Sequence, residues 1–233
     1  MTPETPRVSI IVPVLNESAG INDLVAHIRA TDTERISEII VVDGSADGET
    51  LRAIQDSSVV RVKSDKGRAK QMNEGARAAR GSILLFLHAD TELPEAGLSL
   101  IATAMDRNRF AAGGAFDLGI KSARPAFRLI ESMASLRSRI TRVPFGDQAL
   151  FMRSEYFRAI GGYRDIPLME DVEIMRRIRK KGNKICIIPH KVLTSPRRWE
   201  KDGILCCTVR NWLLQLLYCL GAAPSRLARW YKQ

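Results

Sequence analysis

A polar pair, His88 and Asp90, follows directly after the apolar run at residues 82–87. The run predicts a buried strand, because it is continuous in apolar side chains and lies between Gly81 and Pro94. Residues two apart in an extended chain point the same way, so both polar side chains would lie on one side of the strand's end. Asp90 could then give a divalent cation a hard oxygen ligand, with His88 beside it. The alternative is a strand cap, in which Asp90 accepts backbone N–H bonds from the turn before Pro94.

Two further polar clusters follow predicted strands at residues 8–14 and 38–42. Glu17 comes after the first strand, where it could either contribute to a ligand site or stabilise the N-terminus of the following helix. Asp43 comes after the second, where it could accept a hydrogen bond from the imide of a base or from a ribose hydroxyl. Parallel strands end at one edge of their sheet, and ligands of open α/β sheets bind at that edge. The three clusters together therefore predict a ligand site, although each alone is a weak signal.

Two predicted helices begin with charged residues that could take part in a ligand site at the same edge of the sheet. Arg68 lies near the start of a helix over residues 67–80, where its fork of donors and the unpaired backbone N–H groups suit an anionic or base-bearing ligand. Glu170 and Asp171 open a helix over residues 170–181, where they either complement the helix dipole or include a general base. A Gly-rich phosphate-binding fingerprint is absent, which argues against dinucleotide enzymes and P-loop proteins.

The elements that would position these residues alternate between strand and helix in the first half of the chain. Strands are predicted at 8–14, 38–42, 58–62 and 82–87, and helices at 20–29, 67–80 and 94–107. This alternation predicts a mostly parallel sheet with helices on both faces. Residues 111–120, which contain Gly113-Gly114, predict a strand at a sheet edge or in a small second sheet, and residues 184–188 predict a further strand. A long helix is predicted over 126–140, with one apolar face made of Phe127, Leu129, Ile130, Met133 and Leu136.

Composition and charge narrow the class of protein. With 233 residues, 45% hydrophobic and 27% charged, the chain fits one large globular domain with an appendage. The net charge of +10 is uneven, because residues 176–233 hold 14 Lys and Arg against 2 Asp and Glu, a net of +12, and residues 1–175 net to −2. Such a basic region could meet nucleic acid, an anionic membrane or phosphorylated small molecules, or could only solubilise the surface.

The cysteines and the N-terminal residues indicate the cellular compartment of the protein. The four cysteines include no Cys-x-x-Cys spacing and none precedes Cys186, which argues against a disulfide framework or a structural zinc site. No basic segment followed by an apolar one opens the chain, so no secretory signal is visible. We expect a cytoplasmic protein, with a location at the inner face of a membrane as the open alternative.

That alternative depends on residues 204–220, which are strongly apolar. Arg210, Asn211 and Gln215 interrupt this segment, and its uninterrupted part is shorter than the ~20 residues that span a bilayer. This region contains a stripe of apolar and basic residues that would suit a helix lying in a membrane interface: Trp212, Leu213, Leu216, Leu217, Leu220, Arg226, Arg229, Trp230 and Tyr231. The same stripe could instead pack on its own domain or on the other subunit of a homodimer.

Four motifs, in this order and spacing, resemble family 2 glycosyltransferases of the GT-A fold. They are 9–17 (Ser-Ile-Ile-Val-Pro-Val-Leu-Asn-Glu), 41–45 (Val-Val-Asp-Gly-Ser), 87–90 (Leu-His-Ala-Asp) and 169–171 (Met-Glu-Asp). The resemblance covers about residues 7–195. Residues 66–73 (Lys-Gly-Arg-Ala-Lys-Gln-Met-Asn), 88–91 (His-Ala-Asp-Thr) and 194–199 (Thr-Ser-Pro-Arg-Arg-Trp) further resemble the subgroup called radical-SAM/selenodomain-associated transferase 2.

The resemblance implies an α/β GT-A fold, which is a Rossmann-like, mostly parallel sheet with helices on both faces and a small antiparallel element. It implies a glycosyltransferase domain over residues 1–200, with a nucleotide-binding half at about 1–110 and an acceptor half at about 111–200. Residues 201–233 would form a C-terminal helical extension, which packs on the domain, on a partner or on a membrane surface.

The resemblance also implies roles for individual residues in an inverting transfer from a nucleotide-sugar donor, expected to be a UDP-sugar, to an unknown acceptor hydroxyl. Nucleotide-holding positions are matched by Pro13, Glu17, Asp43 and Arg68. Asp90 matches the last carboxylate of the metal motif, which binds Mn²⁺ or Mg²⁺, and Asp171 matches the catalytic base, with Glu170 beside it. Acceptor-side positions are matched by Asp147, Gln148, Arg197, Arg198 and Trp199, although a turn is the alternative for Asp147 and a basic loop for the arginines.

Two residues depart from the family's pattern. A single aspartate, Asp43, stands where the family usually has two, and His88 replaces the first aspartate of the metal motif. We expect His88 to contact the ribose or a metal-bound water, although imidazole suits Mn²⁺ better than Mg²⁺ as a direct ligand. Other functions stay open: a nucleotidyltransferase on a similar sheet, or a membrane-binding or partner-binding protein with a degenerate transferase site. We expect no nucleic acid partner.

Overall fold

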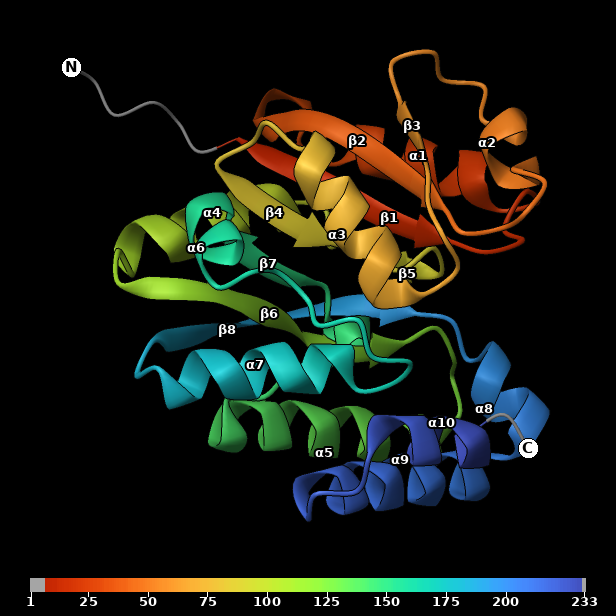
Figure 1. Ribbon diagram of the computed structural model, residues 1–233, viewed down its shortest axis with the longest axis vertical. Coiled ribbons are helices and arrows are strands. Elements are labelled where there is room, and N and C mark those ends of the chain that lie inside the picture. Colours follow the sequence, from red (N-terminus) through yellow and green to blue (C-terminus); the bar gives the residue numbers. More distant parts are fainter. Residues whose placement is uncertain (1–6, 232–233) are drawn as a thin grey trace.

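The computed structural model describes residues 7–231 and shows an eight-stranded sheet with helices on both faces (Figure 1). The strands lie in the order β3-β2-β1-β4-β7-β6-β8-β5. In the described residues β7 and β5 run antiparallel to the other strands, which all share one direction. The strands are β1 (Val8–Val14), β2 (Ile36–Asp43), β3 (Val60–Lys63), β4 (Ile83–Phe86), β5 (Thr91–Glu92), β6 (Ala111–Ile120), β7 (Leu150–Arg153) and β8 (Lys184–Thr194).

The helices cover the sheet and continue beyond it toward the C-terminus (Figure 1). Those before β7 are α1 (Ile21–Ala30), η1 (Thr33–Arg35), α2 (Glu49–Ala53), α3 (Arg68–Ala78), α4 (Gly97–Arg107), α5 (Pro125–Thr141) and η2 (Gly146–Gln148). Those after it are α6 (Ser154–Ala159), α7 (Glu170–Lys180), α8 (Arg197–Asp202), α9 (Ile204–Cys219) and α10 (Pro224–Tyr231). The predicted strands and helices of the first half are therefore confirmed, with ends that differ by a few residues.

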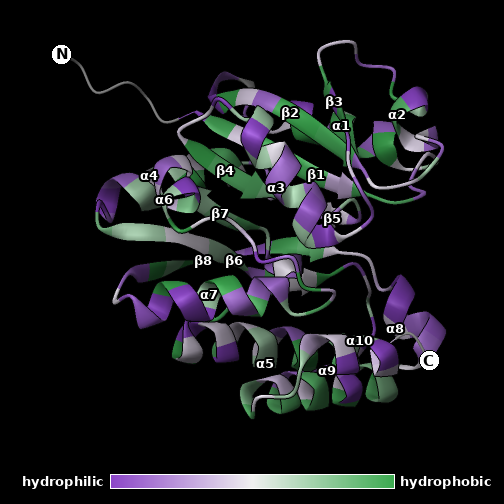
Figure 2. Cartoon of the chain, in the orientation of Figure 1, coloured by the Kyte–Doolittle hydropathy of each residue, from purple (hydrophilic) through white to green (hydrophobic). Residues whose placement is uncertain are grey.

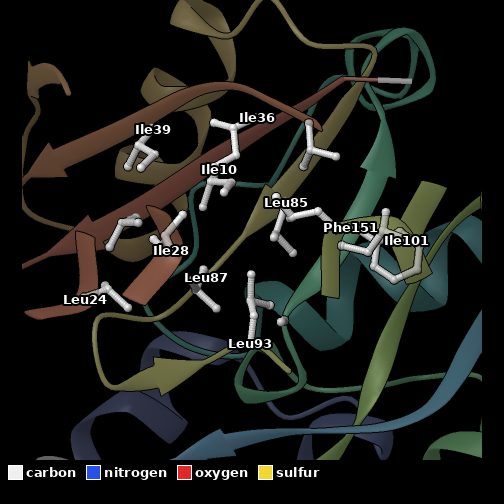
Figure 3. Packing of buried hydrophobic residues seen from close by; sticks show 14 of the residues in the cluster. Ile10, Leu24, Ile28, Ile36, Ile39, Leu85, Leu87, Leu93, Ile101 and Phe151 are labelled. Carbon is white, nitrogen blue, oxygen red and sulfur yellow. The ribbon is translucent and has the colours of Figure 1, made fainter. Parts of the chain in front are cut away.

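Two apolar cores hold these layers together, one on each face of the sheet. Ile10 and Ile11 are neighbours in β1 and lie in different cores, as the period of a strand requires. The first core packs α1 and α4 on the sheet, and Figure 3 shows Leu85 of β4 in this core. The second packs α3 and α7 on the opposite face. Because β1 and β4 are covered on both faces, their sequences are continuous apolar runs.

The strand predicted at a sheet edge lies in the sheet interior. β6 runs between β7 and β8, and all ten of its residues are buried. Its glycines permit close packing, because a Cβ on Gly113 would lie 2.1 Å from the carbonyl oxygen of Phe151 and one on Gly114 would lie 2.2 Å from that of Cys186. The prediction was wrong because glycine in a strand marks close backbone approach as well as an edge.

The apolar face predicted for residues 126–140 is divided in α5. Phe127 is fully buried, whereas Leu129 and Leu136 are 63% and 60% exposed.

Within residues 7–231, none of the helices has the length and apolar character needed to cross a membrane.

Candidate active site

A cleft of about 610 Å³ opens at the carboxyl ends of β1 and β4, where the strand order changes direction. Residues from the loops after both strands, from the start of α3 and from the start of α7 line it. It brings together ten of the predicted site residues: Pro13, Glu17, Arg68, His88, Asp90, Asp147, Glu170, Asp171, Arg198 and Trp199. Residues that are as much as 186 positions apart in the chain thus meet in one cleft.

Asp171 lies at the first turn of α7, and its carboxylate is held in place by backbone donors. Gly146 N–H donates to Asp171 Oδ2 at 2.7 Å, and Val172 N–H donates to Oδ1 at 2.7 Å. The residue before the pair, Met169, has a φ of 69°, a left-handed conformation that is strained for a residue with a side chain. The carboxylate therefore has a fixed orientation and still has lone pairs for a ligand in the cleft.

Glu170 is oriented differently from its neighbour. Its side chain is 4% exposed, and Arg68 Nη1 lies 3.3 Å from its Oε1. Burial raises the pKa of the Glu170 carboxyl, against the opposing effect of the Arg68 charge. Glu170 thus fixes the guanidinium of Arg68 at the cleft, while Asp171 is the carboxylate with free lone pairs.

His88 is half-buried in the cleft wall beside the loop that holds Asp171. Burial, followed by the positive charges of Arg68 and Arg198, lowers the pKa of His88 to about 3. The imidazole is therefore neutral near pH 7 and can accept one hydrogen bond and donate another. A Cβ on Gly146 would lie 2.8 Å from His88 Nε2 and 3.4 Å from Asp171 Oδ2.

This crowding gives a prediction for Gly146→Ala. We expect the added methyl group to displace the imidazole of His88 or the N–H bond to Asp171, and to slow turnover by about tenfold or more, because small misplacements of catalytic groups are costly. The comparison is steady-state turnover of both proteins, with thermal unfolding to verify folding. Gly161→Ala is a control for loss of a glycine, since no atom lies within 4 Å of its Cβ position, although its φ of 81° adds strain. Equal turnover of Gly146→Ala and the parent chain would contradict the prediction.

Asp90 faces a cation supplied by a distant part of the chain. Arg197 Nη2 lies 3.6 Å from Glu17 Oε2 and 4.0 Å from Asp90 Oδ2. The backbone supports this arrangement, because Ser195 N–H donates to the carbonyl of Asp90 at 3.1 Å. Arg197 therefore lies beside nucleotide-side residues and does not line the cleft, in contrast to its predicted acceptor-side place.

Asp43 lies beneath the cleft and does not line it. Its side chain is fully buried, and Ser45 N–H donates to its Oδ1 at 2.8 Å. Its Oδ2 has no hydrogen-bond partner among the described residues. An unpaired buried carboxylate oxygen costs free energy, so this atom is a candidate acceptor for a ligand N–H group.

Gln148 is also buried, and it supports the loop instead of lining the cleft. Its Oε1 accepts from Ser138 Oγ at 2.7 Å and from Phe145 N–H at 3.2 Å, and its Nε2 donates to the Phe116 carbonyl at 2.8 Å. The structure thus removes Gln148 from the acceptor side. Its hydrogen bonds fix the loop that carries Gly146 and Asp147.

Asp147 lines the cleft with one carboxylate oxygen sealed from solvent. Its Oδ1 has no hydrogen-bond partner among the described residues. Burial, and next the negative charge of Asp171, raises the pKa of Asp147 from 3.8 to about 6, although Arg137 opposes this. The folded chain therefore holds the proton up to about pH 6, whereas the unfolded chain releases it near pH 3.8.

This shift predicts how Asp147→Asn changes stability with pH. The folded state binds the extra proton between pH 4 and 6, so the stability of the parent chain falls as pH rises through this window and stays lower above it. Asparagine removes the ionised form, so we expect a gain on the order of 1 kcal/mol at pH 8, or roughly 2–4 °C in unfolding temperature, and little gain at pH 4. Thermal unfolding of both proteins from pH 4 to 8 measures this difference, and a pH-independent difference would contradict it.

The C-terminal helices supply cleft residues that the sequence did not reveal as such. Asn211 and Leu214 of α9 and Tyr231 of α10 line the cleft. Arg198 donates to the hydroxyl of Tyr231, and its guanidinium also lies over the Tyr231 ring. The sequence predicted Tyr231 within an interfacial stripe, and no local pattern indicates its contact with Arg198, 33 positions earlier.

The comparison with known families agrees with this arrangement. The family description "Glycosyl transferase family 2" matches residues 9–162, about two thirds of the chain. The chain belongs to glycosyl transferase family 2. The matched part of this glycosyltransferase includes the loops after β1, β2 and β4, whereas Asp171 lies beyond it.

Curated relatives of the glycosyltransferase match over about half of its length. A dolichol-phosphate mannosyltransferase of Mycosarcoma maydis is 31% identical over 134 residues, which are 51% of this chain and 45% of that protein. A PGL/p-HBAD biosynthesis glycosyltransferase of Mycobacterium bovis (strain BCG / Pasteur 1173P2) is 32% identical over 136 residues, or 48% of this chain and 53% of that protein. The glycosyltransferase thus spans about half the length of these relatives.

Two solved structures of similar fold align with a larger share of this chain than the curated relatives do. A mannosyltransferase from Pyrobaculum calidifontis in complex with GDP-Man and Mn²⁺ has a TM-score of 0.62 at 23% identity, covering 81% of this chain and 56% of that one. TarS of S. aureus in complex with UDP has a TM-score of 0.65 at 18% identity, covering 81% and 60%. These likenesses confirm the predicted GT-A fold.

Proposed function

We propose that this glycosyltransferase moves a sugar, with inversion at its anomeric carbon, from a nucleoside diphosphate donor to an acceptor hydroxyl. The observation that carries the proposal is the fixed carboxylate of Asp171 in a cleft that also holds Arg68 and Arg198. A positioned carboxylate can take a proton, and guanidinium groups can stabilise a departing diphosphate. Both requirements of glycosyl transfer thus meet in one cleft.

The proposed reaction is a single in-line displacement. The acceptor oxygen bonds to the anomeric carbon while the bond from that carbon to the diphosphate oxygen breaks, and the bonding electron pair leaves with the nucleoside diphosphate. Asp171 takes the proton of the acceptor hydroxyl and later releases it to solvent. No bond to the enzyme forms, so the configuration inverts.

Several features support a donor site on the β1, β2 and β4 side of the cleft. The first turn of α3 has no acidic residue, and Lys66, Gly67 and Arg68 at its start line the cleft, which suits phosphate. Asp43 Oδ2 would accept an N–H of the base after a shift of the loop that follows β2. Pro13, Glu17 and His88 would surround the ribose and diphosphate.

A divalent cation, Mn²⁺ or Mg²⁺, fits the acidic part of this donor site. Asp90 offers a carboxylate that is 36% exposed, and it already faces the positive charge of Arg197. In residues 7–231 no three His, Cys, Asp or Glu side chains converge on a metal position, so the donor's phosphate oxygens and water would complete the ligand set. The cation held by Asp90 would neutralise charge on the departing diphosphate.

The proposal also covers the parts of the chain. We take residues 1–200 as the catalytic domain, with about 1–110 holding the donor and about 111–200 the acceptor, and residues 201–233 as its extension. Asp147, Arg198 and Trp199 are the proposed acceptor-side residues that line the cleft. We retain the proposed membership of the radical-SAM/selenodomain-associated transferase 2 subgroup and a UDP-sugar as the first donor to test.

Incubation of the full chain with nucleotide-sugars and Mn²⁺ tests the reaction class. UDP-sugars and GDP-sugars are both assayed, because the structural neighbours carry GDP-Man and UDP. We expect release of the nucleoside diphosphate, and its loss in Asp171→Asn. Cleavage of the nucleotide-sugar by labelled pyrophosphate to a labelled nucleoside triphosphate and a sugar 1-phosphate, without diphosphate release, would overturn the proposal in favour of a nucleotidyltransferase.

A further inference from the structure

Helices α5 and α9 expose large apolar side chains at helical spacing. In α5 these are Leu129, Met133, Leu136 and Ile140, which recur every three or four residues and so share one face. In α9 and at its C-cap they are Leu205, Val209, Trp212, Leu213, Leu216 and Leu220, which share a face in the same way. We call these ten side chains the apolar ridge.

The two rows lie on neighbouring helices. Phe127 and Ile130 of α5 belong to the same apolar core as Cys207 and Ile204 of α9, with Trp199 of α8 in that core, so the exposed rows lie on other faces of the two helices. Figure 1 shows α5 and α9 side by side at the bottom of the molecule, and Figure 2 shows that α9 is largely hydrophobic. Within residues 7–231 the ridge is uncovered, with Leu205 77% exposed. Apolar surface of this kind marks a contact site.

The charges near the ridge are positive. Helices α5, α9 and α10 contain one acidic residue, Glu131, and it is buried against Arg128 and Lys191. Exposed arginines lie on α10 and at the ends of α5 (Arg124, Arg142, Arg226 and Arg229), whereas the exposed Arg128 and Arg139 of α5 already pair with Glu131 and with Asp117 of β6. A partner for this surface must therefore be apolar in its interior and anionic at its boundary.

We propose that the apolar ridge docks on an anionic lipid bilayer, with α5 and α9 lying in the plane of the interface. Acyl chains would cover the apolar side chains, and lipid phosphates would pair with the arginines. Trp212 and Trp230 are 43% and 53% exposed, and tryptophan favours the boundary between acyl chains and water. A second copy of the chain fits less well, because a twofold contact would place the same arginines against each other.

The docking surface and the cleft share a helix. Asn211 and Leu214 lie on the cleft side of α9, whereas Trp212, Leu213 and Leu216 lie on its exposed side. A docked bilayer would therefore lie next to the C-terminal wall of the cleft. This consequence for the acceptor rests on the proposed function, while the docking itself depends on the ridge alone.

Flotation of the full chain with lipid vesicles tests the docking. One set of vesicles is phosphatidylcholine alone, and the other has equal parts of phosphatidylcholine and phosphatidylglycerol. We expect flotation with the anionic vesicles, and weaker flotation in about 1 M salt, where the Debye length falls to about 3 Å. The double variants Leu213→Gln/Leu216→Gln and Leu136→Gln/Ile140→Gln should each bind roughly tenfold or more weakly, because polar side chains replace buried apolar ones.

Phe110→Gln is the matched control, because Phe110 is 87% exposed and lies outside the ridge. It should float like the parent chain. No flotation with anionic vesicles, or equal binding by the ridge variants, overturns the proposal. A dimer in analytical ultracentrifugation that the ridge variants abolish, without vesicle binding, assigns the ridge to a second copy instead. Diphosphate release without vesicles should be unchanged in the ridge variants, which separates this result from a failure of the proposed function.

Discussion

Replacing Asp171 by asparagine is expected to slow sugar transfer by about 10³-fold, within the 10²–10⁴-fold that a positioned general base contributes. The amide cannot take the proton of the acceptor hydroxyl. Its oxygen can still accept the N–H of Gly146 or of Val172, each of which is 2.7 Å from the carboxylate. The side chain thus stays near its place while the proton acceptor is lost. Single-turnover rates with saturating donor measure this effect.

Donor binding and stability are the controls for this variant. Calorimetry should show nearly unchanged affinity for the nucleoside diphosphate, because other residues of the cleft make the proposed donor contacts: Pro13, Glu17, Arg68, His88 and Asp90. Removing the charge of Asp171 should also lower the pKa of Asp147, since that charge is the second cause of its rise. Normal turnover in Asp171→Asn would reject Asp171 as the base. A loss of donor affinity that accounts for the slower rate would assign it to the donor site instead.

Glu170→Gln separates the roles of the two adjacent carboxylates. Glutamine keeps a hydrogen-bond acceptor for Arg68 but removes the ion pair across 3.3 Å. We expect a modest loss of donor affinity through a less firmly held guanidinium, and a much smaller loss of turnover than in Asp171→Asn. Comparable losses of turnover in both variants would contradict the division of roles proposed for this pair.

The sequence predicted β1, β2 and β4 well because these three strands are largely buried on both faces. Ile10 and Ile11 lie in different cores, so both must be apolar, and the strand reads as a continuous run. The prediction for β8 ended at residue 188, whereas the strand continues to Thr194. A register shift places Ile188 opposite Phe116 and Lys191 opposite Asp117, so the irregularity accommodates Pro189 and His190.

The longer β8 has a consequence for the site. It carries the following loop to Asp90, where Ser195 donates to the backbone and Arg197 faces the carboxylate. Local motifs predicted which residues gather at the cleft, but they could not show this approach. The same limit applies to Gln148 and Tyr231, because the burial of one and the cleft contact of the other depend on segments far away in the chain.

Replacing Asp90 by alanine is expected to abolish the effect of Mn²⁺ on donor binding. Asp90 is the proposed protein ligand of the cation, and no group of three metal-binding side chains in the described residues offers a substitute. We expect affinity for the nucleoside diphosphate in Mn²⁺ to fall by about 100-fold, because loss of an outer-shell partner already costs about 10–100-fold and Asp90 is the proposed direct ligand. The measurement is calorimetry of both proteins with and without Mn²⁺. Asp106→Ala is the control, since Asp106 is exposed on α4 and lies away from the cleft.

Arg197 makes this prediction specific to the metal. Without the Asp90 charge, its guanidinium keeps Glu17 as a partner at 3.6 Å and remains available to the diphosphate. Metal-free donor binding by Asp90→Ala should therefore equal or exceed that of the parent chain, because a negative charge near the phosphates is gone. Equal losses with and without Mn²⁺ would show that Asp90 supports the donor loop instead of holding a cation. A parent chain that binds donor equally well with EDTA would show that no cation takes part.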